Sequence, residues 1–310
     1  MIVTVTLNPA LQVEYVAPRL LPGAVNEVSQ VSYLAGGRGL TVARVLQMFG
    51  HEVVAAGLVG GHAGELVKAE LARSGVATQF TPIAAESRRV LLVRDLAAGT
   101  VTSLREPAPY ITTEELGRLA ADYRSLLDGA DAVVLSGSLP AGLPVETYGS
   151  LVRYATEAGV PVVLNAGGRA LRYGAVRRPA MVIPDVATAA GGTFDVAGPL
   201  ADAAALLAAG VGAVAVPGPA EMLVLTAADR WRARLKRPEI AGAAGYGSQD
   251  RLDALVAGLV PGIALAWSWP DALAHAAAMT AAWLDHGDLD LEAYERLLPE
   301  VEVEQLPAAG

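Results

Sequence analysis

The chain has 310 residues, of which 53% are hydrophobic and 18% charged, so it can bury a large core and is not intrinsically disordered. Its formal net charge of -9, without a long basic run, argues against nucleic acid and anionic membrane surfaces as partners. The absence of cysteine excludes disulfides, thiolate catalysis and zinc–thiolate sites.

The first ten residues, MIVTVTLNPA, are apolar but lack a basic leader and a long hydrophobic region, so they predict a first strand. The longest apolar runs are too short to span a bilayer. We therefore expect a cytoplasmic protein with no membrane segment. The histidines are scattered without the spacing of metal ligands, and we expect ordinary surface or core roles for His51, His62, His275 and His286.

Short β-branched runs alternate along the chain with alanine- and leucine-rich segments of helical length. The expected strands are 2–8, 53–59, 132–137, 161–166, 180–185 and 212–218. The expected helices are 39–50, 64–75, 113–129, 145–159 and 199–210. Because nearly continuous apolar strands alternate with helices, the pattern predicts an α/β fold with a mainly parallel sheet and helices on both faces. Such sheets bind ligands beyond the carboxyl ends of their strands.

Four segments show a different, period-two alternation of polar and apolar residues, which indicates strands with one exposed face. They are 13–20, 26–34, 88–95 and 100–106. We expect a small β-sheet lid, approximately 12–34 and 88–106, inserted in a single domain of residues 1–310. Since one lid face must be covered by ligand, by the main domain or by a second copy, a homodimer through the lid is a further expectation.

Three glycines precede an amphipathic helix in LAGGRGLTVARVL, residues 34–46. Glycine permits close approach of the backbone, and N–H groups at a helix start attract anions. Arg38 could add a bidentate phosphate contact. The alternative interpretation is a tight turn from a strand to a helix, and this segment alone does not decide between them.

Four motifs occur in a fixed order: TLNPAL (6–11), AGGRG (35–39), LSGSLPAGLP (135–144) and LLPEVEVEQL (297–306). Together they resemble the PfkB, or ribokinase-like, carbohydrate kinases, and most closely the 1-phosphofructokinase and tagatose-6-phosphate kinase branch. The resemblance implies a Rossmann-like α/β domain with a β-sheet lid. It also implies ATP with Mg²⁺, a phosphorylated sugar as substrate, and often a dimer formed lid to lid.

The resemblance implies a substrate phosphate site. Arg88 and Ser138 match the residues that contact the sugar phosphate, and Gly36 and Gly37 keep the glycine turn. Arg38 stands where the family has lysine, which keeps the charge but replaces a point charge by a planar fork.

The residues expected to bind the sugar hydroxyls differ from the family pattern. Gln12 replaces an aspartate, and Thr41 replaces an asparagine. Because an amide accepts fewer hydrogen bonds than a carboxylate and also donates, the substrate is not fixed by the resemblance.

The nucleotide side departs further from the pattern. Asp185 matches a family asparagine and could still reach Mg²⁺, whereas Thr188 replaces a glutamate. Gly218 lies in the loop expected to approach ATP, between Pro217 and Pro219, which stiffen it.

The segment GYGSQDRLDALVAGLV, residues 245–260, decides whether the chain has a catalytic base. In the family, Ala-Gly follows the catalytic aspartate at four and five residues, and Ala257 and Gly258 match that pair, so the resemblance places the aspartate at Asp253. Asp250, Arg251 and Leu252 then stand where the anion hole requires small residues, and we expect these bulky side chains to obstruct it. In a second alignment Gly247 begins the motif and Asp250 is the base. In a third, structural interpretation Asp250 is a helix N-cap that forms a capping box with Asp253. Pro261 is expected to kink or end the helix near Val260.

Two functions follow from these observations. The first is a 1-phosphofructokinase-like kinase that transfers phosphate from ATP to a hexose-phosphate hydroxyl, with weak or lost catalysis. The second is a pseudokinase that binds a phosphosugar as a sensor or partner subunit.

Overall fold

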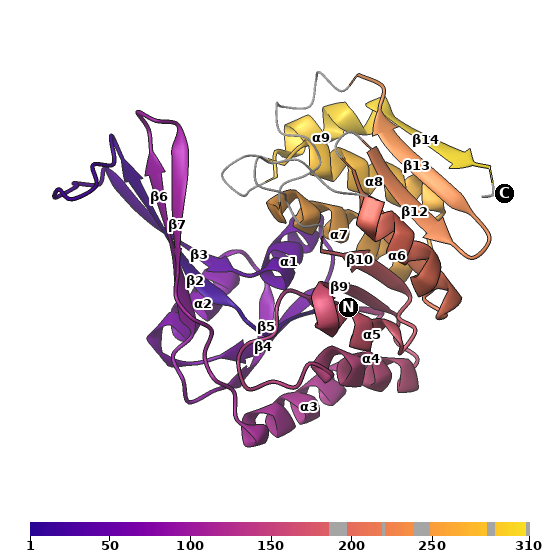
Figure 1. Cartoon of the computed structure of the whole chain (residues 1–310), viewed down its shortest axis with the longest axis horizontal. Helices are drawn as coiled ribbons and strands as arrows, with labels where there is room; N and C mark the ends of the chain where they lie inside the picture. The colour runs from indigo at the N-terminus through magenta and orange to yellow at the C-terminus, as the bar shows by residue number, and fades with distance from the viewer. Residues whose placement is uncertain (186–196, 219–220, 238–248, 284–288, 308–310) are drawn as a thin grey trace.

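Among the residues that the structure describes, ten strands in the order β14-β13-β12-β11-β10-β9-β8-β1-β4-β5 form the central sheet of the larger part of the molecule (Figure 1). The computed structural model describes residues 1–185, 197–218, 221–237, 249–283 and 289–307. Every neighbouring pair from β11 to β5 is parallel, and β12, β13 and β14 add an antiparallel edge. The strands are β1 Ile2–Thr6, β4 Val53–Val59, β5 Ala77–Pro82, β8 Ala132–Ser136, β9 Val162–Ala166, β10 Met181–Pro184, β11 Ala213–Pro217, β12 Glu221–Thr226, β13 Arg230–Leu235 and β14 Val301–Leu306.

Helices cover both faces of this sheet, as the apolar strands predicted. Side chains of successive strand residues enter different cores, since Ile2 belongs to one buried cluster and Val3 to the other. The first cluster includes α1 Arg38–Met48, α2 Gly61–Arg73, α7 Gln249–Ala264, α8 Trp269–Ala281 and α9 Leu291–Leu297. The second includes α3 Thr113–Leu127, α4 Thr147–Glu157, α5 Gly168–Ala175 and α6 Ala197–Ala208. None of the described helices has the length and apolar character that crossing a bilayer requires.

A second, four-stranded sheet stands away from the main sheet and forms the lid (Figure 1). Its order is β3-β2-β6-β7, with a parallel β2–β6 pair and antiparallel outer pairs. The strands are β2 Ala10–Ala17, β3 Gln30–Gly36, β6 Arg88–Asp95 and β7 Thr100–Arg105. The α/β fold with a lid is confirmed, although the first lid strand begins and ends three residues earlier than its alternation predicted, before Pro18.

The antiparallel edge was not predicted. Strands β13 and β14 alternate arginine and glutamate on one face, where Arg232 pairs with Glu304 and Arg234 with Glu302. These charges obscure the alternation of apolar residues that predicts a strand, so this edge could not be recognised from the sequence. Charged side chains on an edge also discourage pairing with other chains.

Of the two effects expected of Pro261, ending the helix near Val260 is wrong, and a kink there stays a prediction. Helix α7 continues to Ala264, with Pro261 inside it. Leu255, Leu259 and Val260 are fully buried in the first core, so packing holds the helix through the position where proline removes a hydrogen bond.

Gly258 brings α7 into close contact with α8. A Cβ at Gly258 would lie 2.4 Å from the Cα of Ala276, and that backbone cannot give way cheaply. We predict that Gly258→Ala lowers the free energy of unfolding by about 1–3 kcal/mol in a urea titration, as overpacking does. The matched control is Gly117→Ala in α3, where a Cβ meets nothing within 4 Å, and it should stabilise the protein. Equal effects of the two changes would contradict this packing argument.

Candidate functional site

The glycine turn brings the start of α1 against the end of β1. Gly37 is the N-cap of α1 and has a φ of 135°, a conformation that side chains disfavour. A Cβ at Gly39 would lie 2.5 Å from the Oγ1 of Thr6. The glycines are therefore needed for the helix start to reach the strand, as both interpretations of the turn require.

A cavity of about 440 Å³ lies between the lid and the carboxyl ends of β1, β8 and β10. This position is where open α/β sheets bind ligands. The structure brings most of the predicted site residues to its walls. They are Gln12, Gly36, Gly37, Arg38, Thr41, Arg88, Ser138, Asp185 and Asp253.

Two arginines from neighbouring lid strands line the same cavity. Arg105 of β7 lies opposite Val90 of β6, two residues from Arg88, so both guanidinium groups come from one face of the lid. Burial, and then the positive charge of Arg105, lower the pKa of Arg88. Neither arginine forms an ion pair with a carboxylate of the described chain, and the Nη2 of Arg88 donates to the backbone oxygen of Asn8 at 3.4 Å. The pair is suited to a dianion such as phosphate.

Arg105 was not among the site residues predicted from the sequence. Its signal was present in the alternation of 100–106, which places Arg105 on the same lid face as Val90 once the two strands pair. What was missing was the register of that pair.

The loop after β8 supplies neutral hydrogen-bonding groups. The Nδ2 of Asn8 donates to the Oγ of Ser138 at 3.2 Å, and the Oδ1 of Asn8 is buried without a hydrogen bond. Tyr148 donates its hydroxyl hydrogen to the backbone oxygen of Gly137 at 2.9 Å. Burial raises the pKa of Tyr148, so its phenol stays a neutral donor that positions this loop.

Arg38 lies between two carboxylates. Its Nη2 forms a close ion pair with the Oδ1 of Asp185, and its Nε lies 3.7 Å from the Oδ1 of Asp253. The Arg38 side chain is 14% exposed and that of Asp253 only 5%, so the electrostatic interaction is weakly screened. The guanidinium thereby joins α1, the end of β10 and α7 at the cavity wall.

Comparison with known proteins identifies the family. A family model described as "pfkB family carbohydrate kinase" matches residues 8–188. The chain belongs to the PfkB family of carbohydrate kinases. A possible 1-phosphofructokinase from Thermotoga maritima is 26% identical, with a TM-score of 0.83 over 99% of this chain and 100% of that chain.

Phosphofructokinase-2 from Escherichia coli, 20% identical, shows the same fold in two of its structures. Its complex with fructose-6-phosphate has a TM-score of 0.82, and its tetrameric inhibited form one of 0.83. Each alignment covers 96% of this chain and 98% of that chain.

In this PfkB protein Asp253 is the fifth residue of α7 and lines the cavity. Because α7 begins at Gln249, Asp250 lies inside the helix and is not its N-cap, so the predicted capping box is wrong. Arg251 and Leu252 are buried, and the Nη1 of Arg251 donates to the backbone oxygen of Thr280 in α8. Neither side chain lines the cavity, and their obstruction of an anion hole stays a prediction.

The nucleotide-side residues are less closely grouped. Gly218 does not line the cavity, and its N–H donates to the backbone oxygen of Glu221 at 2.7 Å, so that donor is already used. Gly247 and Thr188 lie outside the described residues.

Asp185 is the candidate ligand for Mg²⁺. The described residues contain no group of three or more His, Asp or Glu side chains that could hold a metal ion. A Mg²⁺ ion carried by phosphates usually needs only one or two protein carboxylates, so Asp185 fits that limited role. Its carboxylate is ion-paired with Arg38, which a cation would have to displace.

We predict that Arg38→Ala lowers the free energy of unfolding by about 3 kcal/mol, because it removes the guanidinium that faces the partly buried Asp185 and the buried Asp253. Urea denaturation measures this loss. Arg153→Ala, which removes an exposed pair with Glu157 in α4, is the control and should leave stability nearly unchanged. A loss no larger than in the control would show that the Arg38 contacts do not stabilise the fold.

Proposed function

We propose that this PfkB protein binds a phosphorylated sugar in the cavity of about 440 Å³ and phosphorylates one of its hydroxyls slowly, with ATP as donor. The observation that carries the proposal is the convergence of Arg88 and Arg105 on the cavity that Asp253 also lines. A dianion site and a carboxylate base in one cavity are what a sugar-phosphate kinase needs.

The substrate phosphate lies between Arg88 and Arg105 in this proposal. Ser138 and Asn8 border the same space: the hydroxyl of Ser138 can donate to the phosphate, and the unpaired Oδ1 of Asn8 can accept from an adjacent sugar hydroxyl. Gln12 and Thr41 face the sugar ring. The phosphofructokinase-2 relative binds fructose-6-phosphate, which supports a phosphosugar of similar size as the first ligand to test.

Asp253 accepts the proton of the attacking hydroxyl as the sugar oxygen bonds to the terminal phosphorus and the bond to the ADP oxygen breaks. MgATP supplies the phosphoryl group when bound, with Asp185 as the residue that would hold Mg²⁺. Arg38, next to both carboxylates, can stabilise negative charge on the transferred group.

Slow catalysis follows from the same contacts. In the structure Arg38 pairs with Asp185 and faces Asp253, so base and metal ligand are both engaged with a cation. The N–H of Gly218 already donates to the backbone oxygen of Glu221, so one donor to the nucleotide is lost. These contacts also favour a second candidate function, a protein that binds the phosphosugar without transferring phosphate.

We predict that Asp253→Asn lowers the rate of ADP release with MgATP and fructose 6-phosphate or fructose 1-phosphate by at least about 100-fold, the usual contribution of a general base. Asp128→Asn, at the exposed end of α3, is the control and should keep the wild-type rate. If the wild type itself releases no ADP above background with either sugar or with tagatose 6-phosphate, the kinase proposal fails for these substrates.

We predict that Arg88→Gln weakens calorimetric binding of the sugar phosphate by about 10- to 100-fold, since it removes a charge-assisted contact. Arg89→Gln is a matched control, because the Arg89 side chain is exposed and pairs with Glu106. Binding by the wild type without ADP release would establish the second candidate function. Equal binding by both variants would contradict the phosphate site.

We also propose a homodimer formed through the lid. Tyr33 and Leu104 are 52% and 56% exposed, and they lie in one row across the lid with Val13 and Leu91. The Escherichia coli relative has a tetrameric form, which supports assembly in this fold. Light scattering should give the mass of a dimer for the wild type and of a monomer for Leu104→Glu; a monomeric wild type would exclude the proposal.

A further inference from the structure

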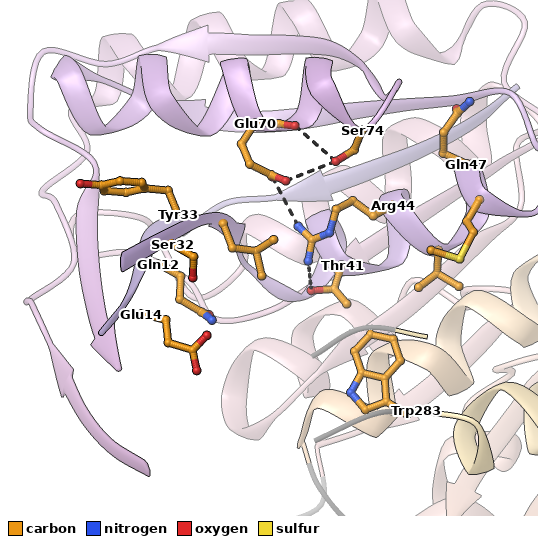
Figure 2. A pocket seen from close by; sticks show the side chains of 13 residues that line it. Gln12, Glu14, Ser32, Tyr33, Thr41, Arg44, Gln47, Glu70, Ser74 and Trp283 are labelled. Carbon is orange, nitrogen blue, oxygen red and sulfur yellow. Dashed lines mark hydrogen bonds and ion pairs between the residues drawn. The ribbon is translucent and has the colours of Figure 1, made fainter. Parts of the chain in front are cut away.

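A second and larger cavity opens beside the candidate site. It has a volume of about 660 Å³, is bounded by β2 and β3 of the lid, by α1 and α2, and by Trp283, and is called here the Trp283 chamber (Figure 2). It shares Gln12, Leu34 and Thr41 with the cavity of about 440 Å³ in which the phosphorylated sugar is proposed to bind. Both volumes lie in the range of ligand pockets, ~300–1,000 Å³.

The two cavities meet at the residues that depart from the PfkB pattern. Gln12 and Thr41 replace an aspartate and an asparagine that the resemblance assigned to sugar hydroxyls, and both face the two cavities at once. A threonine is shorter than an asparagine, so it leaves more room at this boundary. A ligand seated in the first cavity can therefore extend into the second past Gln12 and Thr41.

The charged side chains of the chamber wall are already paired. The Nη1 of Arg44 lies 3.8 Å from the Oε2 of Glu70 (Figure 2). The same Nη1 donates to the backbone oxygen of Ala35 at 2.6 Å, and the Oε2 of Glu70 accepts from the N–H of Ala35. Glu14 pairs with Arg94. Since these charges are compensated within the protein, the chamber is suited to an uncharged polar ligand and not to a second phosphate.

Trp283 supplies an unused donor. Trp283 is 5% exposed, and its Nε1 is buried without a hydrogen-bond partner in the described chain. In Figure 2 the indole nitrogen is on the edge of the ring turned towards Gln12 and Glu14. A buried indole N–H normally finds an acceptor, and a hydroxyl oxygen of a ligand in the chamber would be one.

We infer that the Trp283 chamber binds an uncharged, hydroxyl-rich sugar ring next to the phosphorylated ring, so that the preferred ligand is a phosphorylated disaccharide. The inference rests on the proposed phosphosugar site and extends it. Gln12 hydrogen-bonds at the junction of the two rings, and Trp283 donates to a hydroxyl of the second ring. Apolar ring faces pack on Leu34, Val45 and Met48, which also line the chamber.

Calorimetry tests this with fructose 6-phosphate and the 6-phosphates of trehalose, sucrose and maltose. At least one disaccharide phosphate should bind the wild type at least about tenfold tighter than fructose 6-phosphate. Trp283→Phe removes only the N–H and part of the ring, and should weaken that binding by about tenfold, the effect of one hydrogen bond. Binding of fructose 6-phosphate should stay within about twofold, which also shows that the variant is folded.

Trp231→Phe is the matched control. Trp231 in β13 also has a buried Nε1 without a partner but lines neither cavity, so this variant should bind every ligand as the wild type does. Fructose 6-phosphate bound as tightly as all three disaccharide phosphates, or equal losses in the two variants, overturns the inference while the proposed function stands. If no phosphosugar binds, both fail together.

The same titration distinguishes a linked second ring from a free sugar. Unphosphorylated trehalose, sucrose or maltose added to protein saturated with fructose 6-phosphate should not bind if the ring must be linked. If one binds and Trp283→Phe abolishes that binding, the chamber chemistry is supported with a free sugar as the ligand.

Discussion

The contact of Arg38 with Asp185 and Asp253 is the interaction on which the candidate site depends. The three residues come from the start of α1, the end of β10 and the first turns of α7, segments distant in sequence that meet only in the folded chain. Two carboxylates at the end of a buried sheet repel each other unless a cation lies between them. Arg38 provides that cation, and it also competes with any metal ion or substrate that needs the same oxygens. Structural stability and catalytic readiness are therefore opposed at this position.

Much of the fold could be predicted because its signals are local. The apolar runs at 53–59 and 132–137 predict buried strands, and the alternation at 88–95 predicts a strand with one exposed face. The structure has strands at all three segments. The antiparallel edge carries its signal in charge pairs such as Arg232 with Glu304, which exist only when β13 and β14 align. Pro261 misled the prediction because the packing around α7 outweighs one local backbone rule.

The candidate site was predictable as a set of residues but not as a set of contacts. The motifs pointed to Arg88, Ser138 and Asp253 as site residues, and all three line one cavity in the structure. They did not reveal Arg105, because its place depends on strand register, or the inward direction of Arg251, because that depends on the backbone oxygen of Thr280 in α8. Side-chain direction is a property of tertiary packing, and a spacing rule along the chain does not contain it.

The position of β14 has a consequence for the order in which the molecule can be completed. The first strand, β1, lies inside the sheet between β4 and β8, whereas the last strand pairs with β13, which precedes it by some seventy residues. During synthesis the sheet can grow from its middle as soon as β4 and β8 emerge. One side of β13 keeps its backbone hydrogen-bonding groups unpaired until residues 301–306 have left the ribosome. During that time the arginines on β13 discourage its exposed edge from pairing with other chains. Completion of the sheet thus awaits the emergence of residues 301–306.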